Sequence, residues 1–243
     1  MRTVLYVPLI SLSLLWATQA SAGWSIFRNC ASLLRNKVDF TQDEDGFVSA
    51  NGVSVTGENL YTTPMILKNL DINETMVQTM AGKHLLSVGE GFSGLVPFLR
   101  QKGIYASALD LWYASKKIPP TFVGQQMREY IDTHNEYLIS GSAFSIPVED
   151  KTYDFVVSHM MVNNFDFETG LPFLKEAVRI TKPGGEIRIF GYDERLLNRI
   201  SQTFARYFKG QIIYTTELRE FEYSVNESYH TRSDLLLTIR VME

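Results

Sequence analysis

The 243-residue sequence contains a single cysteine, Cys30, so no disulfide can form within the chain and a folded domain must rely on its hydrophobic core. It has no excess of basic residues either, because 23 Lys and Arg stand against 27 Asp and Glu, a net charge of −4. Sequence-independent binding to nucleic acid requires clustered Lys and Arg. We therefore expect no nucleic-acid partner, and we predict no metal site. The length and the hydrophobic content of 45% predict one domain with a sizeable core.

The apolar stretch nearest the N-terminus is too short to span a bilayer. Val4–Ala17 has 14 residues, whereas a spanning helix needs about 20. Arg2 precedes this stretch, and Ala20-Ser21-Ala22 follows it with the small-x-small pattern of a cleavage site. We predict a signal peptide over residues 1–22, cleaved after Ala22, and a secreted or periplasmic protein without a stable membrane anchor. The location would be cytoplasmic if the signal is not used.

The most informative segment covers residues 84–94, HLLSVGEGFSG, in which an apolar run of strand length enters a glycine-rich turn. The amphipathic stretch LVPFLRQKG follows and predicts a helix. Gly89, Gly91 and Gly94 fit the spacing GxGxxG, in which the glycines permit a tight turn, close approach of a ligand and packing of helix on strand. A structural turn without a ligand is the alternative. With its neighbours, the segment is typical of a nucleotide-type site.

A second expected strand, 104–110, ends in an acidic residue. Asp110 lies 21 residues after Gly89, and at this separation a carboxylate can accept hydrogen bonds from both hydroxyls of a ribose. We therefore expect Asp110 and the adjacent Leu111 to contact the adenosine half of a bound cofactor.

Two later segments decide between nucleotides. Residues 141–158, GSAFSIPVEDKTYDFVVS, and 174–190, LKEAVRITKPGGEIRIF, closely resemble blocks of the class I S-adenosylmethionine-dependent methyltransferases. Nicotinamide dehydrogenases share the glycine loop but lack this later pair, so a nicotinamide-binding protein is the less favoured alternative. The resemblance spans about residues 84–192 and implies S-adenosylmethionine as cofactor and methyl transfer to a small-molecule or protein acceptor. The cofactor-binding residues it implies are Gly89, Glu90, Gly91, Gly94, Asp110, Leu111, Ser142, Ala143 and Phe144.

The alternation of strand and helix patterns predicts an α/β fold. With the resemblance, it implies a Rossmann-like, doubly wound, mostly parallel seven-stranded sheet with an antiparallel last strand. We expect helices between the first five strands, a small N-terminal extension over 23–70 with a helix at 24–36 and a hairpin around Asn51-Gly52, and a methyltransferase-like domain over 71–243. The expected strands are 85–89, 104–110, 137–141, 154–158, 186–191, 211–217 and 235–242.

Two positions depart from the family pattern. Ser87 and Ser142 stand where the family commonly has acidic residues, which weakens the expected grip on the cofactor. Glu90, between the glycines, is hypothesised to supply the missing negative charge near the cofactor's ammonium group. The alternative to an enzyme is therefore a binding protein that keeps the methyltransferase-like fold but has lost catalysis.

His159 follows the fourth expected strand, where the resemblance places residues that face the methyl acceptor. Oxygen and nitrogen acceptors usually require a base, and an imidazole that titrates near pH 6.5 is the natural candidate. The alternative is that His159 only holds the loop that follows it. The predicted export conflicts with the implied cofactor, because charged S-adenosylmethionine does not cross bilayers freely. An exported enzyme would need a destination that contains S-adenosylmethionine.

Overall fold

The structure, a computed structural model, describes residues 40–42, 48–50, 53–55, 62–114, 122–164, 167–225 and 228–243. The predicted signal peptide and the helix expected over 24–36 lie outside these ranges. Within them, β2 (Val48–Ala50) and β3 (Val53–Val55) pair antiparallel, which confirms the strands expected around Asn51-Gly52. A further strand, β1 (Phe40–Gln42), pairs with β2 and was not anticipated.

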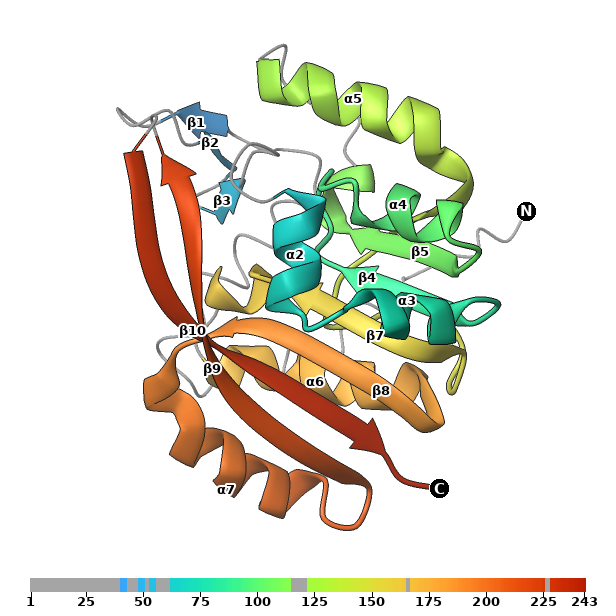
Figure 1. The fold of residues 1–243 in the computed structure, drawn as a ribbon, viewed down its shortest axis with the longest axis vertical. Coiled ribbons are helices and arrows are strands. Elements are labelled where there is room, and N and C mark those ends of the chain that lie inside the picture. The colour runs from blue at the N-terminus through green and yellow to red at the C-terminus, as the bar shows by residue number, and fades with distance from the viewer. Residues whose placement is uncertain are drawn as a thin grey trace, which may run out of the picture.

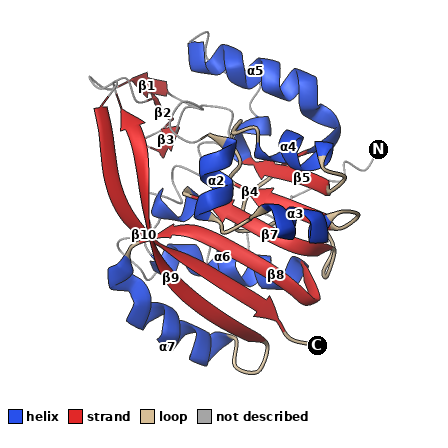
Figure 2. Ribbon diagram, viewed as in Figure 1, coloured by secondary structure: helices blue, strands red, loops and turns tan. Residues whose placement is uncertain are grey.

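A seven-stranded sheet carries the fold (Figures 1 and 2). The order from one edge to the other is β6-β5-β4-β7-β8-β10-β9. The five strands from β6 to β8 run parallel, and β10 runs antiparallel to both of its neighbours, β8 and β9. This is the predicted sheet. The strands are β4 (His84–Val88), β5 (Tyr105–Asp110), β6 (Leu138–Ser140), β7 (Tyr153–His159), β8 (Thr181–Tyr192), β9 (Ile212–Val225) and β10 (Ser228–Val241).

Two hydrophobic cores lie on opposite faces of the sheet. One core joins α6 (Phe167–Ile180) and α7 (Leu197–Tyr207) to the sheet. The other joins it to three shorter helices, α2 (Thr63–Asn69), α3 (Glu74–Met80) and α4 (Leu95–Gln101). The helix expected between the second and third strands is α5 (Phe122–His134).

One expected helix is missing. Residues 141–152, between β6 and β7, form turns, so the prediction of a helix between every pair of the first five strands is wrong here. Arg179 on α6 fixes this segment instead. Its guanidinium donates to the carbonyls of Ile146 and Val148, each at 2.9 Å, and to Asp150 at 2.7 Å. The 12-residue connection therefore lies against α6 without a helix of its own.

The final hairpin is longer than the sequence pattern predicts. Pairing between β8 and β10 runs from Leu235 to Arg240, whereas pairing between β9 and β10 continues to Ser228 and Val225. The far end of the hairpin therefore projects past β8, as Figure 1 shows. Phe221 on this hairpin is buried against Phe190 of β8, with ring centroids 5.2 Å apart.

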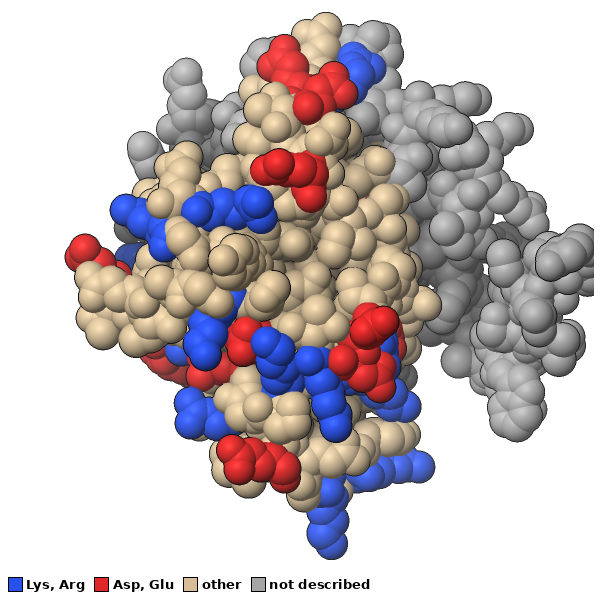
Figure 3. Space-filling model, turned by 90° about the vertical axis from the view of Figure 1, so that its right-hand side faces the viewer, with Lys and Arg blue, Asp and Glu red and all other residues tan. Residues whose placement is uncertain are grey.

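Charge is mixed on the face shown in Figure 3, where Lys and Arg alternate with Asp and Glu. None of the described helices is both long enough and apolar enough to cross a membrane.

Candidate functional site

The glycine loop has the backbone that its sequence requires. Gly89, Gly91 and Gly94 have φ values of 72°, 58° and 77°, a left-handed region that favours glycine. A Cβ at Gly89 would come within 2.7 Å of the Met161 side chain, whereas a Cβ at Gly91 would meet nothing within 4 Å. Gly89 is therefore required by packing, and Gly91 leaves open space in which a ligand can approach the backbone.

Asp110 lies beside this loop. Its Oδ2 accepts a hydrogen bond from the Gly91 N–H and its Oδ1 accepts one from the Trp112 N–H, both at 2.9 Å. The residue is only 9% exposed, and burial raises the pKa of its carboxyl. A carboxylate has about four acceptor positions. Asp110 can therefore still accept hydrogen bonds from a ligand.

Glu90 turns into the base of the loop. Its carboxylate accepts hydrogen bonds from the Ser93 hydroxyl at 2.7 Å, from the Val96 N–H at 3.2 Å and from the Ser87 hydroxyl. Burial raises the pKa of Glu90, although these three donors oppose the shift. Ser87, one of the two departures from the family pattern, is thus a partner of Glu90. The carboxylate ties β4 to the start of α4, and its role toward an ammonium group stays a prediction.

The third predicted segment lies next to Asp110. Ser140 of β6 pairs with Asp110, and the Gly141 N–H donates to the Asp110 carbonyl at 3.3 Å. In the turn that follows, the Ser142 hydroxyl accepts from the Phe144 N–H at 3.2 Å, and Ala143 is buried. Leu111 begins a short 3-10 helix, Leu111–Ala114. The structure therefore brings these predicted cofactor residues to one edge of the sheet.

The sequence leaves two roles open for Tyr113, stacking near the adenine or ribose of a cofactor and packing in the core. Its hydroxyl donates to the Gly91 carbonyl at 2.6 Å. Burial raises the pKa of Tyr113, so the hydroxyl keeps its proton. The available sequence signal was an aromatic residue three positions after the acidic end of a strand.

His159 ends β7 and is enclosed by two neighbours. Its ring stacks on Phe190 with centroids 5.5 Å apart, and its Nε2 lies 3.0 Å from Asn69 Nδ2. Burial lowers the pKa of His159 to about 3. The imidazole is therefore neutral at physiological pH, and the expectation that it titrates near pH 6.5 is wrong. Its role as a base stays a prediction.

Helix α2 reaches from the glycine loop to β7. At its start, the Thr63 hydroxyl donates to the Ser93 carbonyl at 3.3 Å. At its end, Asn69 contacts His159. Because α2 lies in the segment expected to form an extension, its residues were not predicted to belong to the site, and the local sequence carries no signal for the contact.

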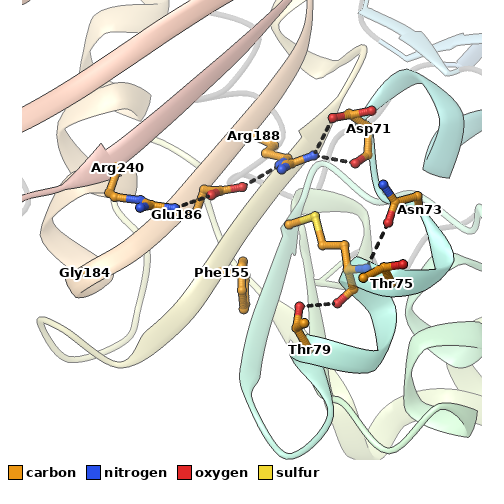
Figure 4. Close-up of a pocket in the computed structure, with 10 residues that line it drawn as sticks. Asp71, Asn73, Thr75, Thr79, Phe155, Gly184, Glu186, Arg188 and Arg240 are labelled. Atoms are coloured by element: carbon orange, nitrogen blue, oxygen red, sulfur yellow. Dashed lines mark hydrogen bonds and ion pairs between the residues drawn. The ribbon is translucent and has the colours of Figure 1, made fainter.

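A separate groove of about 580 Å³ lies between α3 and strands β7, β8 and β10 (Figure 4). A chain of charges runs along it, from Arg240 through Glu186 and Arg188 to Asp71. Phe155 lines it near the start of β7 and pairs there with Glu186 of β8, whereas the glycine loop and Asp110 lie after or at the ends of their strands and His159 ends β7. The groove is therefore distinct from the predicted cofactor site.

The chemistry available at the glycine-loop edge is that of two buried carboxylates, a neutral imidazole and a phenol. Among the described residues, no group of three or more His, Cys, Asp and Glu side chains is placed to hold a metal ion. The arrangement can bind and orient a polar ligand and exclude water from it.

Residues 86–189 match the sequence profile of a family described as "Methyltransferase domain", a match that covers less than half of the chain. The demethylmenaquinone methyltransferase of Bacillus mycoides is 32% identical over 88 residues, and that of Listeria welshimeri is 30% identical over 88 residues. Each alignment covers 36% of this chain and 36% of the relative. The chain therefore spans about a third of the length of these curated relatives.

Two solved structures share the fold. A Pyrococcus horikoshii protein, provisionally named an RNA methyltransferase, has a TM-score of 0.54 at 10% identity, covering 89% of this chain and 100% of that one. A structure described for the conversion of a disulfide bond into a thioacetal group during echinomycin biosynthesis has a TM-score of 0.50 at 13% identity, covering 72% of this chain and 80% of that one. Together with the strand order, these likenesses define an α/β, Rossmann-like methyltransferase fold.

Proposed function

We propose that this protein is an S-adenosylmethionine-dependent methyltransferase. One observation carries the proposal: the Gly91 N–H donates to Asp110, which joins the glycine loop after β4 to the acidic end of β5. In open α/β sheets, ligands bind outside the carboxyl ends of the strands where the strand order reverses. Here that point is β4, which pairs with β5 on one side and β7 on the other.

The residues present fit the cofactor. Asp110 keeps acceptor capacity for a ribose diol, and the space beside Gly91 is open. Ser142, Ala143 and Phe144, next to the end of β5, would border the adenine. Gly89 and Gly94 would hold the turn, and Leu111 would contribute backbone.

Charge favours this cofactor over a dinucleotide. The hydrogen-bond donors to Glu90 and Asp110 found among the described residues are all neutral hydroxyl or amide groups. A cationic ligand would therefore give these carboxylates an opposite charge that they lack. In nicotinamide-binding Rossmann proteins the same loop approaches an anionic diphosphate, which Glu90 would repel when ionised.

S-adenosylmethionine, when bound, supplies a methyl group on a positively charged sulfur. The leaving group is then already activated, so the protein has chiefly to orient the acceptor and exclude water. Helix α2 lies between the glycine loop and His159 and would serve the second task. The methyl acceptor is either a small molecule or a protein.

A methyltransferase-like binding protein without catalysis is the second candidate. The observation that favours it is the engagement of His159 Nε2 by Asn69, because a ring nitrogen that already accepts a hydrogen bond is a poor base. Turnover of S-adenosylmethionine separates the two candidates, since only the enzyme produces S-adenosylhomocysteine.

Heat-denaturation curves with S-adenosylmethionine, S-adenosylhomocysteine and NAD test the cofactor. A ligand at 100 times its dissociation constant adds about 2.7 kcal/mol to stability. We expect stabilisation by the first two ligands and none by NAD. Stabilisation by NAD alone would replace the proposal with the dinucleotide alternative.

We also propose that residues 1–22 form a signal peptide and that the mature protein is secreted or periplasmic. Support comes from Arg2, the apolar Val4–Ala17 run and Ala20-Ser21-Ala22. Mass spectrometry of the protein from its native host should find Gly23 at the N-terminus. An intact Met1 would refute the export proposal and remove the difficulty of cofactor supply.

A further inference from the structure

We propose that Asn69 is a positioning residue that holds His159 in the tautomer with its proton on Nδ1, so that His159 cannot take a proton from the methyl acceptor. The consequence for the acceptor rests on the proposed function. The tautomer itself does not, and it can be measured separately.

The first step is the contact between the two side chains. Asn69 Nδ2 lies 3.0 Å from His159 Nε2, and Asn69 is only 1% exposed. An amide nitrogen donates hydrogen bonds and does not accept them, so Nε2 must present its lone pair to Asn69. A neutral imidazole has one protonated and one unprotonated nitrogen. With the Asn69 amide oriented in this way, the proton resides on Nδ1.

The second step is the rigidity of the end of α2. Asp71, with φ 57°, donates through its N–H to the Lys68 carbonyl at 3.1 Å, and the Ile72 N–H donates to the Leu67 carbonyl at 2.8 Å. These two bonds form the Schellman pattern that ends many helices. Asn69 is the last residue of this helix and is therefore held by its backbone on both sides.

The third step is a pair of arginines from the sheet. Arg188 of β8 donates to the carbonyls of Leu70 and Asp71 at 2.8 and 2.6 Å, and Arg219 of β9 donates to the Lys68 carbonyl at 2.8 Å. Figure 4 shows Arg188 reaching Asp71 from the sheet. The residues on both sides of Asn69 are thus fastened to β8 and β9 of the same sheet.

The fourth step is the support of the ring from the sheet. His159 stacks on Phe190 at an interplanar angle of 19°, and Phe190 packs edge-on against Phe221 of the hairpin. The ring is therefore held between α2 and an aromatic pair, and it can exchange its partner on Nε2 only if one of these elements moves.

The chemical consequence concerns the class of acceptor. A general base must offer a lone pair, and in this arrangement His159 has its free pair on the nitrogen that Asn69 occupies. The acceptor's own lone pair forms the bond to the methyl carbon, while the electrons of the sulfur–methyl bond remain on sulfur. This site therefore suits an acceptor that is nucleophilic before it binds, such as an ionised thiol, a stabilised carbanion or a neutral ring nitrogen, and disfavours an alcohol.

Nuclear magnetic resonance of the ¹⁵N-histidine-labelled protein measures the tautomer directly. We expect the His159 signals, assigned by their loss in His159→Gln, to show a protonated Nδ1 and an unprotonated Nε2 at pH 7. A protonated Nε2, or a charged ring, would overturn the proposal. This result does not depend on cofactor binding, so a protein that fails to bind S-adenosylhomocysteine could still confirm the tautomer, and the two failures are distinguishable.

Two matched substitutions test whether Asn69 sets the tautomer. A carboxylate accepts hydrogen bonds only, so Asn69→Asp should transfer the proton from Nδ1 to Nε2. Asn73→Asp makes the same chemical change at the N-cap of α3, where Asp is tolerated, and should leave His159 unchanged. An unaltered tautomer in a folded Asn69→Asp protein, or a change in Asn73→Asp, would show that Asn69 does not position the ring. Should Asn69→Asp not fold, the tautomer of the unsubstituted protein still tests the proposal, because a protonated Nε2 could not accept a hydrogen bond from Asn69.

Discussion

The Gly91 N–H donates to Asp110 Oδ2 at 2.9 Å, which links the glycine loop after β4 to the last residue of β5. The two strongest signals in the sequence, separated by 19 residues, thus meet in one hydrogen bond. Because Asp110 also accepts from the Trp112 N–H, its carboxylate organises the backbone on which the cofactor is proposed to lie. Binding and local stability are therefore expected to change together at this position.

Asp110→Asn should weaken binding of S-adenosylhomocysteine by about 30- to 150-fold, because a charge-assisted hydrogen-bond pair contributes about 2 to 3 kcal/mol. The introduced amide nitrogen would face a backbone N–H, so the free energy of unfolding should also fall by about 1 to 3 kcal/mol. Calorimetric titration and urea unfolding measure the two effects. Asp132→Asn, on the exposed face of α5, should change neither. Unaltered affinity in Asp110→Asn would show that Asp110 does not bind the cofactor.

Gly91→Ala and Gly82→Ala form a matched pair. Both glycines have positive φ, 58° and 73°, and at both positions a Cβ would meet nothing within 4 Å. Each substitution should therefore cost about 1 to 2 kcal/mol of stability from backbone strain. Only Gly91→Ala should also weaken S-adenosylhomocysteine binding, by about tenfold or more, because the second glycine of the loop admits the ligand to the backbone. Equal affinities in the two variants would show that the ligand does not approach Gly91.

Arg179→Met should destabilise the domain by about 2 to 4 kcal/mol, since it removes a partly buried ion pair with Glu176 and the donors to the turn after β6. The hydrogen bond from Arg179 lowers the pKa of Glu176 below its ordinary 4.5. A group with a lowered pKa stabilises the folded state above its unfolded pKa and loses this effect as the pH falls through the folded value. The difference between the two proteins should therefore shrink below about pH 4.5 in urea unfolding. Arg206→Met, on the exposed side of α7, is the control, and an equal loss there would contradict the role of Arg179.

His159 should make stability depend on acidity. Burial lowers the pKa of His159 in the folded protein to about 3, from an ordinary 6.5. Between these two pH values the unfolded chain binds a proton on His159 and the folded chain does not. The contribution is present above pH 6.5 and is lost as the pH falls toward 3, at about 1.4 kcal/mol per pH unit from this one group. The unfolding free energy of the parent minus that of His159→Gln should be constant above pH 7 and should fall as the pH drops below 6. Curves that stay parallel down to pH 4 would mean that His159 ionises normally in the folded protein.

The sequence predicts the parts of this fold that depend on local pattern. Glycine spacing fixes the turn after β4, and the distance to Asp110 follows from one helix and one strand of ordinary length. These features are determined by neighbouring residues and could be inferred from them. The strands of the parallel sheet were located for the same reason, because each is a short apolar run bounded by turn residues.

The contacts that could not be predicted join distant segments. Asn69 and His159 are 90 residues apart, and their pairing depends on where α2 settles over the sheet. The orientation of the Glu90 side chain toward the base of the loop could not be predicted either. The sequence does not reveal that Ser87, Ser93 and the Val96 N–H all donate to its carboxylate. The segment between β6 and β7 forms turns instead of the expected helix. Its carbonyls accept hydrogen bonds from Arg179, about thirty residues away along the chain.

The crystal structure of the protein with S-adenosylhomocysteine tests the central claim most directly. We predict that the ribose hydroxyls lie within hydrogen-bond distance, about 2.5 to 3.2 Å, of the Asp110 carboxylate. The amino acid portion should pass beside Gly91 toward His159. Ligand bound in the groove between α3 and β8, or at the sheet edge without contact to Asp110, would contradict the account.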